Sequence, residues 1–244
     1  MQGDCLDRMK EIEDNSIDLV LCDPPYQITS LAWDSIIPFD KLWNEYKRIL
    51  KPTGTVLLFG VGLFTAKVIL SNENWYKQTL IWNKNRCGSP GLSKIRPMQV
   101  TEDIIVFAPK RTVYNPQMEV GEPYYRKSKN KEGYVSRCNT HSYGLKPVKE
   151  ISNSGTRYPK NIINISVDYS AQQRIHPTQK PVALMEYLIK TYSNEGNTVL
   201  DNCMGSCPVG IASILTGRHF VGIEMDSGYF GIALKRLEPY RAIV

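Results

Sequence analysis

The sequence predicts one α/β domain, built on a doubly wound, mostly parallel sheet and interrupted by a basic insertion of irregular structure. Apolar runs of strand length alternate with helix-spaced apolar patterns up to residue 108. From 109 to 175 the alternation disappears, and Lys-rich and Tyr-rich sequence is broken by Pro, Gly and Asn. The alternation resumes after Pro181, so two parts of one domain flank the insertion.

The expected elements follow from the periodicity of the apolar residues. A short aliphatic strand, Ile17 to Cys22, ends at two prolines. A helix over Phe39 to Leu50 has i, i+3, i+4 spacing, and Lys51 to Gly54 should end it. The other elements expected before the insertion are a strand at 55–59, a helix after Gly62, and strands at 79–82 and 103–108. Those expected after it are a helix at 182–192, a strand at 198–201, a helix from about 209, a strand at 219–224 and a helix from about 227.

The composition is that of a globular protein, with 42% hydrophobic and 22% charged residues. No apolar run approaches the roughly 18 residues that span a bilayer, and the first residues do not resemble a secretory signal. We therefore expect a cytoplasmic protein without membrane contacts. The six cysteines form no CxxC pair and only three histidines are present, which favours reduced thiols and no metal site.

The positive charge is concentrated in the insertion. Residues 109–175 hold 12 Lys and Arg against 5 Asp and Glu, a net of +7, whereas the whole chain has +6. They also hold 7 of the 14 tyrosines. Cations that contact phosphates, together with rings that stack on bases, favour nucleic-acid binding. The alternative is a solvated insertion whose charge only maintains solubility.

Asp23, Pro24, Pro25 and Tyr26 follow the first strand directly. In open α/β sheets, ligands bind beyond the carboxyl ends of the strands. The two prolines fix an extended turn, so a carboxylate, rigid backbone carbonyls and an aromatic ring should be presented there. The alternative is a proline-rich structural turn with a chance Asp and Tyr.

A second candidate site follows the strand at 198–201. The small-residue turn from Asn202 to Ser206 leads into a helix, which lets backbone N–H groups approach a ligand. Asp201 ends the strand, and Glu224 ends the next one 23 residues later. An acidic side chain at that place commonly accepts hydrogen bonds from ribose hydroxyls. A plain structural turn is the alternative.

Together these segments resemble the β-class amino-group DNA methyltransferases, which use S-adenosylmethionine to methylate adenine N6 or cytosine N4. The resemblance rests on Asp-Pro-Pro-Tyr at 23–26, His-Pro-Thr-Gln-Lys-Pro at 176–181 and the loop at 201–206, in the order typical of that class. It implies a Rossmann-like class I methyltransferase fold. The catalytic half would be 1–108, the target-recognition insertion 109–175 and the cofactor-binding half 176–244.

The resemblance also implies roles for single residues. Asp23 and the Pro24 carbonyl would accept hydrogen bonds from the exocyclic amino group, and Tyr26 would stack on the flipped base. Lys180 would meet the cofactor carboxylate and Glu224 the ribose. The implied catalytic residues are Asp23, Pro24, Pro25 and Tyr26. The implied cofactor-binding residues are Asp4, Cys5, Asp23, Thr178, Lys180, Asp201, Cys203, Gly205, Ser206 and Glu224. The implied DNA-binding residues are Arg126, Lys127, Lys129 and Arg137.

The cofactor loop departs from the class at two important positions. The usual Asp-Pro-Phe-x-Gly-Ser-Gly, followed by Ser or Thr, is Asp-Asn-Cys-Met-Gly-Ser-Cys-Pro at 201–208. Cys207 brings a sulfur to a place where the backbone usually approaches the ligand, and Pro208 removes an N–H. We favour the interpretation that Pro208 begins the next helix at its first position, where the N–H is not needed. The alternative is weakened cofactor binding.

We therefore predict a site-specific DNA adenine-N6 methyltransferase, with S-adenosyl-L-methionine as cofactor and double-stranded DNA as substrate. Asp rather than Ser at position 23 favours adenine over cytosine N4. A third hypothesis, after adenine-N6 and cytosine-N4 methylation, is a DNA-binding protein with impaired cofactor binding. The expected context is bacterial or phage-encoded restriction–modification, with a cognate restriction endonuclease and with the protein as a monomer or homodimer.

Overall fold

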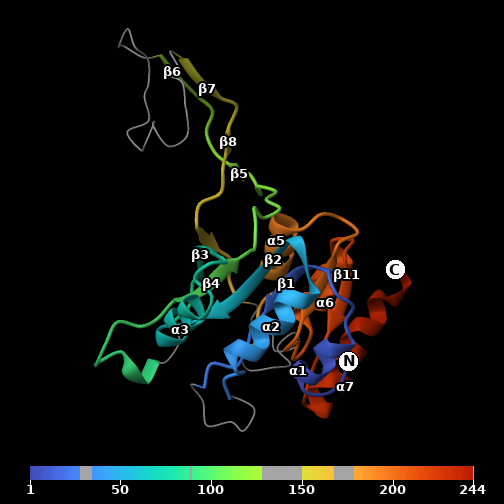
Figure 1. Ribbon diagram of the computed structural model, residues 1–244. Coiled ribbons are helices and arrows are strands. Elements are labelled where there is room, and N and C mark those ends of the chain that lie inside the picture. The colour runs from blue at the N-terminus through green and yellow to red at the C-terminus, as the bar shows by residue number, and fades with distance from the viewer. Residues whose placement is uncertain (28–34, 88–89, 128–149, 168–178, 244) are drawn as a thin grey trace. The chain divides into compact units, whose positions relative to one another are not determined.

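The computed structural model describes residues 1–27, 35–87, 90–127, 150–167 and 179–243 (Figure 1). The chain divides into two compact units. The first contains Met1–Asn115 and Asn161–Val244, and the second contains Pro116–Lys160. The second unit is narrower than the insertion expected at 109–175, because residues at both of its ends pack with the first unit.

The first unit is built on a seven-stranded sheet with the order β11-β10-β1-β2-β4-β3-β9. The strands from β11 to β2 are parallel, β4 is antiparallel to both of its neighbours, and β9 is parallel to β3. The predicted mostly parallel sheet is confirmed. The strands are β1 Ile17–Cys22, β2 Leu50–Gly60, β3 Tyr76–Asn83, β4 Thr101–Phe107, β9 Ile162–Asn164, β10 Thr198–Asp201 and β11 His219–Gly222.

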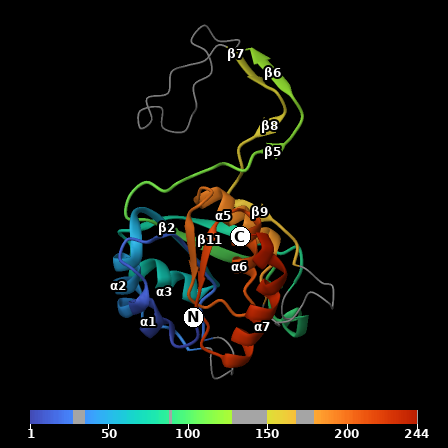
Figure 2. The same cartoon turned by 90° about the vertical axis from the view of Figure 1, so that its right-hand side faces the viewer.

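Helices cover both faces of this sheet (Figure 2). Because side chains alternate along a strand, Val20 and Cys22 of β1 enter the core with α2 and α3, whereas Leu19 and Leu21 enter the core with α5 and α6. No helix in the described part of the chain is both long and apolar enough to cross a membrane. The helices are α1 Cys5–Arg8, η1 Met9–Glu11, α2 Phe39–Ile49, α3 Leu63–Ser71, η2 Pro90–Leu92, α5 Val182–Tyr192, α6 Pro208–Leu215, α7 Ser227–Leu237 and η3 Glu238–Ile243.

Two expectations from the sequence were wrong in detail. Lys51 to Gly54 do not separate helix from strand, because Leu50 is already extended and pairs with Ile17, so β2 includes them. A register irregularity between Ile17 and Leu19 accommodates the added residues. The region 109–175 is also not wholly irregular. It contains β5 Glu119–Val120, β6 Tyr124–Lys127, β7 Glu150–Asn153, β8 Thr156–Arg157 and the sheet strand β9.

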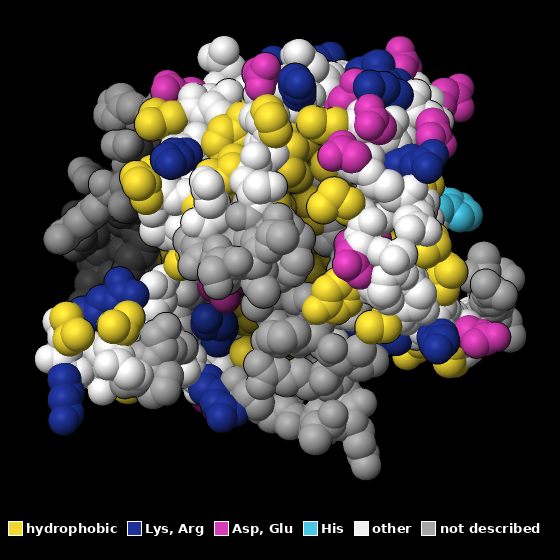
Figure 3. Space-filling model, turned by 90° about the horizontal axis from the view of Figure 1, so that it is seen from below, with side chains coloured by type: hydrophobic (Ala, Val, Ile, Leu, Met, Phe, Trp, Pro, Cys, Tyr) yellow, Lys and Arg dark blue, Asp and Glu magenta, His cyan; other side chains and the backbone are white. Residues whose placement is uncertain are grey.

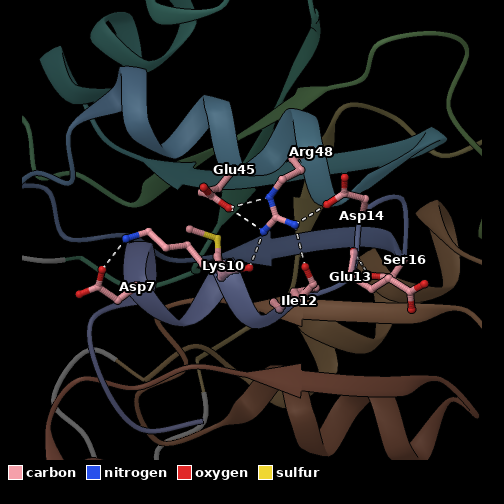
Figure 4. Close-up of polar contacts among 9 residues, drawn as sticks. Asp7, Lys10, Ile12, Glu13, Asp14, Ser16, Glu45 and Arg48 are labelled. Atoms are coloured by element: carbon pink, nitrogen blue, oxygen red, sulfur yellow. Dashed lines mark hydrogen bonds and ion pairs between the residues drawn. The ribbon is translucent and has the colours of Figure 1, made fainter.

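The first twelve residues are fastened to the sheet and to α2. Arg48 on α2 donates to the carbonyls of Met9 (2.7 Å) and Ile12 (2.8 Å) and pairs with Asp14 and Glu45 (Figure 4). At the other end, the Met1 amino group donates to the Gly222 carbonyl of β11. These contacts hold the start of α1 beside the carboxyl end of β11.

Candidate active site

The Asp-Pro-Pro-Tyr turn leaves the sheet at the carboxyl end of β1, which lies between β10 and β2. Both carboxylate oxygens of Asp23 are engaged: Oδ1 accepts from the Tyr26 hydroxyl, and Oδ2 accepts from Lys180 Nζ at 2.6 Å. The Tyr26 ring packs against Phe64 with ring centroids 4.8 Å apart. The carboxylate is therefore held in one orientation by a neutral donor and a cationic one.

Lys180 belongs to a buried ion-pair network that the sequence analysis did not predict. Its ammonium lies 2.6 Å from Asp23 and 3.1 Å from Glu102, and it sits over the Phe59 ring at 5.0 Å from the centroid. Glu102 also pairs with Lys84 at 3.0 Å. In the structure the two ion-pair partners of Lys180 are carboxylates of the protein, and the contact predicted between Lys180 and the cofactor carboxylate stays a prediction.

These contacts determine the charge states within the network. Burial alone would lower the pKa of Lys180, but Asp23 and Glu102 outweigh it, and the pKa is raised. Burial alone would raise the pKa of Glu102, but the cations Lys180 and Lys84 outweigh it, and the pKa is lowered. Lys180 is therefore an ammonium and Glu102 a carboxylate at neutral pH.

The loop at 201–206 is shaped by acidic side chains. Asp201 Oδ1 accepts from the Cys203 N–H at 3.0 Å. Glu224 accepts from the Gly205 N–H and the Asp226 N–H, each at 2.8 Å, so its carboxylate holds the turn itself. Burial raises the pKa of Asp201 to about 8, although its bond to Cys203 lowers it. The ribose contact predicted for Glu224 would be made in addition to these two bonds.

Cys207 and Pro208 occupy positions that are compatible with an intact loop. Pro208 is the first residue of α6, as the sequence analysis favoured. Cys207 has a left-handed backbone with φ 63°, the conformation for which glycine is preferred. Its side chain is fully buried in a cluster with Met204 and Ala233, and its sulfur packs on Gly210 of α6. The sulfur therefore points into the core beneath α7.

Three thiols lie together where α1 meets this loop. Cys203 is hydrogen-bonded to both Cys5 and Cys22. The bond to Cys203, followed by burial, raises the pKa of Cys5, and burial raises that of Cys22 to about 11. These thiols are therefore protonated at neutral pH, and none of their described neighbours activates one of them as a nucleophile. Among the described residues, no group of three or more His, Cys, Asp or Glu side chains is arranged to hold a metal ion.

One cavity of about 1030 Å³ joins the two halves of the site. It brings together twelve of the residues predicted from the sequence. These residues are Asp4, Cys5, Asp23, Pro24, Pro25, Tyr26, Lys180, Asp201, Cys203, Gly205, Ser206 and Glu224. Thr178, Lys129 and Arg137 lie outside the described residues. Arg126 and Lys127 belong to the second unit and do not line this cavity.

Comparison with known proteins agrees with this geometry. The DNA methylase family model matches residues 17–235. The type II methyltransferase M.HpaI of Haemophilus parainfluenzae is 30% identical over 250 residues, covering 94% of this chain and 71% of that protein. The DNA adenine methyltransferase YhdJ of Escherichia coli is 27% identical over 251 residues, covering 98% of this chain and 82% of that protein.

A solved structure, the cytosine-N4-specific PvuII DNA methyltransferase, superposes with a TM-score of 0.68 at 17% identity, covering 99% of this chain and 89% of that one. At this identity the likeness supports the class I methyltransferase fold alone. The family match covers most of the chain and includes both halves of the cavity. The chain belongs to the DNA methylase family, whose members transfer a methyl group from S-adenosylmethionine.

Proposed function

We propose that the protein methylates N6 of an adenine flipped out of a specific site in duplex DNA. One observation carries the proposal: the Asp23 carboxylate, held by Tyr26 and Lys180, shares a cavity with the loop at 201–206. A base inside a duplex cannot reach such a cavity, so the target must leave the stack.

The cavity fits a cofactor and a base together. Small-molecule sites commonly have volumes of about 300–1,000 Å³, and this cavity of about 1030 Å³ is slightly larger than that range. Gly205 has φ 48°, and a Cβ built there would meet nothing within 4 Å, so its backbone borders open space that a ligand can fill. Asp201 and Ser206 would hold the methionine part, Glu224 the ribose, and Asp4 and Cys5 the adenine. When bound, S-adenosylmethionine supplies the methyl group.

The chain's own contribution to the reaction is centred on Asp23. Each carboxylate oxygen has two lone pairs, so the bonds from Tyr26 and Lys180 leave acceptor capacity for an amino group. A hydrogen bond from that amino group favours a pyramidal nitrogen, and the carboxylate stabilises the positive charge that develops on it. The Tyr26 ring would stack on the base. This chemistry requires no thiolate, in agreement with the raised pKa values of Cys5 and Cys22.

The second unit would read the DNA sequence. The guanidinium groups of Arg126 and Arg157 lie over the Tyr124 ring, at 5.1 Å and 4.8 Å from its centroid. Tyr125 and Tyr158 are 61% and 74% exposed. Exposed rings beside cations suit stacking on bases and contact with phosphates. Lys127, which pairs with Glu150 at the surface, and Arg126 would contribute to phosphate binding.

Two alternatives predict different outcomes for the DNA. Cytosine-N4 methylation poses the same chemical problem, and the choice of adenine rests on Asp at position 23. The second alternative, a DNA-binding protein without catalysis, assumes that Cys207 and Pro208 obstruct the cofactor loop. The burial of the Cys207 sulfur in the core argues against this obstruction.

We further propose that the protein acts in the cytoplasm beside a cognate restriction endonuclease, as a monomer or homodimer.

Sequencing that detects modified bases, on DNA from cells expressing the protein, tests the proposal. We expect N6-methyladenine at one defined sequence, and its absence from cells expressing Asp23→Ala. N4-methylcytosine at a defined sequence would establish the alternative substrate. Unmodified DNA from cells that contain the folded protein would contradict both.

A further inference from the structure

The connection between β3 and β4 is a second basic segment. Residues 84–100 contain four Lys and Arg and no Asp or Glu. The segment leaves the sheet after Asn83 and returns at Thr101, which face each other in the β3–β4 register. Gly60 at the end of β2 faces Asp103 near the start of β4. Both ends of the segment therefore lie at the sheet edge where Asp23 follows β1.

The structure describes residues 84–87 and 90–100 of this connection, and residues within 90–99 contribute to one wall of the catalytic cavity. Arg96 and Met98 line the cavity together with Asp23 and Tyr26. In Figure 1 the segment is the green one that projects from the first unit at lower left. On the face drawn in Figure 3, dark-blue Lys and Arg side chains lie beside yellow hydrophobic ones. A target base that enters the cavity would bring its flanking backbone to this wall.

Two cations within residues 90–99 are exposed. Lys94 and Arg96 are exposed, and neither lies within ion-pair distance of an acidic side chain among the described residues. Lys84, by contrast, is occupied by Glu102. Two exposed cations beside a site that receives a nucleotide suit backbone phosphates.

A large apolar side chain stands between these two cations. Ile95 is 79% exposed, and the N–H groups of Ile95 and Arg96 both donate to the Leu92 carbonyl, at 2.9 Å and 3.0 Å. The turn thus presents Lys94, Ile95 and Arg96 in succession. Apolar side chains at such places contact bases whose stacking has been disturbed.

We propose that residues 90–99 form a DNA-contacting surface separate from the second unit. Lys94 and Arg96 bind phosphates that flank the target nucleotide, and Ile95 packs against the DNA beside the position that the flipped base vacates. This inference rests on the proposed action on duplex DNA. It adds contacts on the catalytic unit to those that the second unit would make.

The test measures binding of a fluorescently labelled mixed-sequence duplex at a series of salt concentrations. Each lost phosphate contact reduces the slope of log K against log salt by about 0.9, so Lys94→Gln with Arg96→Gln should reduce it by about 1.8. Lys94→Gln alone, which alters no residue lining the cavity, should reduce it by about half as much. The matched control, Lys67→Gln with Lys77→Gln, removes two exposed cations from α3 and from the opposite end of β3 and should leave the slope unchanged.

A separate pair of variants tests the apolar contact of Ile95. Ile95→Ala should weaken binding about fivefold at every salt concentration without changing the slope, whereas Leu70→Ala, at a 68% exposed position on α3, should have no effect. Thermal unfolding of each variant checks that the fold is retained. An unchanged slope in the double Lys94 and Arg96 variant, with normal binding by the natural protein, would overturn this inference alone. Absence of duplex binding by the natural protein would instead count against the proposed function.

Discussion

The ion pairs around Asp23 lead to a prediction that separates catalysis from stability. Asp23→Asn keeps the shape of the side chain and an acceptor for Tyr26, but it removes the negative charge 2.6 Å from Lys180. Catalysis should fall at least a hundredfold, or about 2.7 kcal/mol, because a preorganised acceptor acts mainly in the transition state.

The effect on stability follows from the second partner of Lys180. Removing one member of a buried ion pair costs about 3–5 kcal/mol when the remaining charge has no other partner. The Lys180 side chain is only 9% exposed, but Glu102 stays 3.1 Å from its ammonium. The free energy of unfolding should therefore fall by about 2 kcal/mol, roughly half of that range. Urea denaturation measures the stability, and single-turnover methyl transfer measures the catalysis.

Asp18→Asn is the matched control. Asp18 lies on the same strand, near its other end, and also pairs with a lysine, Lys51, at 2.8 Å. This variant should lose stability while keeping its turnover. A folded Asp23→Asn protein with more than a tenth of natural turnover would refute the assignment of Asp23. If Asp23→Asn and Asp18→Asn lost turnover equally, the loss would be explained by damage to β1 and not by a catalytic role of Asp23.

Three further predictions concern the same cavity. Tyr26→Ala should reduce turnover more than Tyr26→Phe or Tyr26→Trp in steady-state assays, because stacking on a ring contributes about 1–3 kcal/mol per base; equal losses would indicate a role of the hydroxyl. Cys207→Gly with Pro208→Thr should change S-adenosylmethionine affinity by less than about threefold, or 0.65 kcal/mol, in calorimetric titration, and a gain of tenfold would contradict the described loop. Burial raises the pKa of Asp201 from 3.8 to about 8, so the folded state binds a proton that the unfolded state releases. In urea denaturation the free energy of unfolding should therefore fall as pH rises between these values, and the contribution of Asp201 should disappear in Asp201→Asn.

Most of the predicted site residues that line the cavity lie at or directly after the carboxyl ends of parallel strands. Asp23 follows β1 and Asp201 ends β10, and these strands are neighbours in register. Short apolar runs mark the strand ends, and parallel strands bring those ends to one edge. The ion pair between Lys180 and Asp23 could not be predicted in the same way, because the two residues are far apart in the sequence and no local pattern indicates that they meet.

The sequence suggested no role at the site for Glu102 or Lys84, for a related reason. Glu102 lies at the start of β4, and an antiparallel strand brings its start, not its end, to the catalytic edge. A carboxylate before an apolar run was a visible signal, but it has meaning only once the direction of the strand is known. Similarly, the charge count over long ranges hid the basic segment at 84–100, because acidic residues elsewhere in the first unit balance its cations.

The loop at 201–208 illustrates what a substitution alone does not reveal. The sequence identifies Cys207 as a departure from its class, but the consequence depends on the direction of its side chain. A left-handed residue with a Cβ needs space, and Gly210 provides it: a Cβ at 210 would lie 2.4 Å from the Cys207 sulfur and 2.7 Å from the Phe220 ring. Glycine at 210 thus accommodates cysteine at 207, and the sulfur fills the core instead of the cofactor site. The departure in the loop and the glycine on the helix are two parts of one packing arrangement.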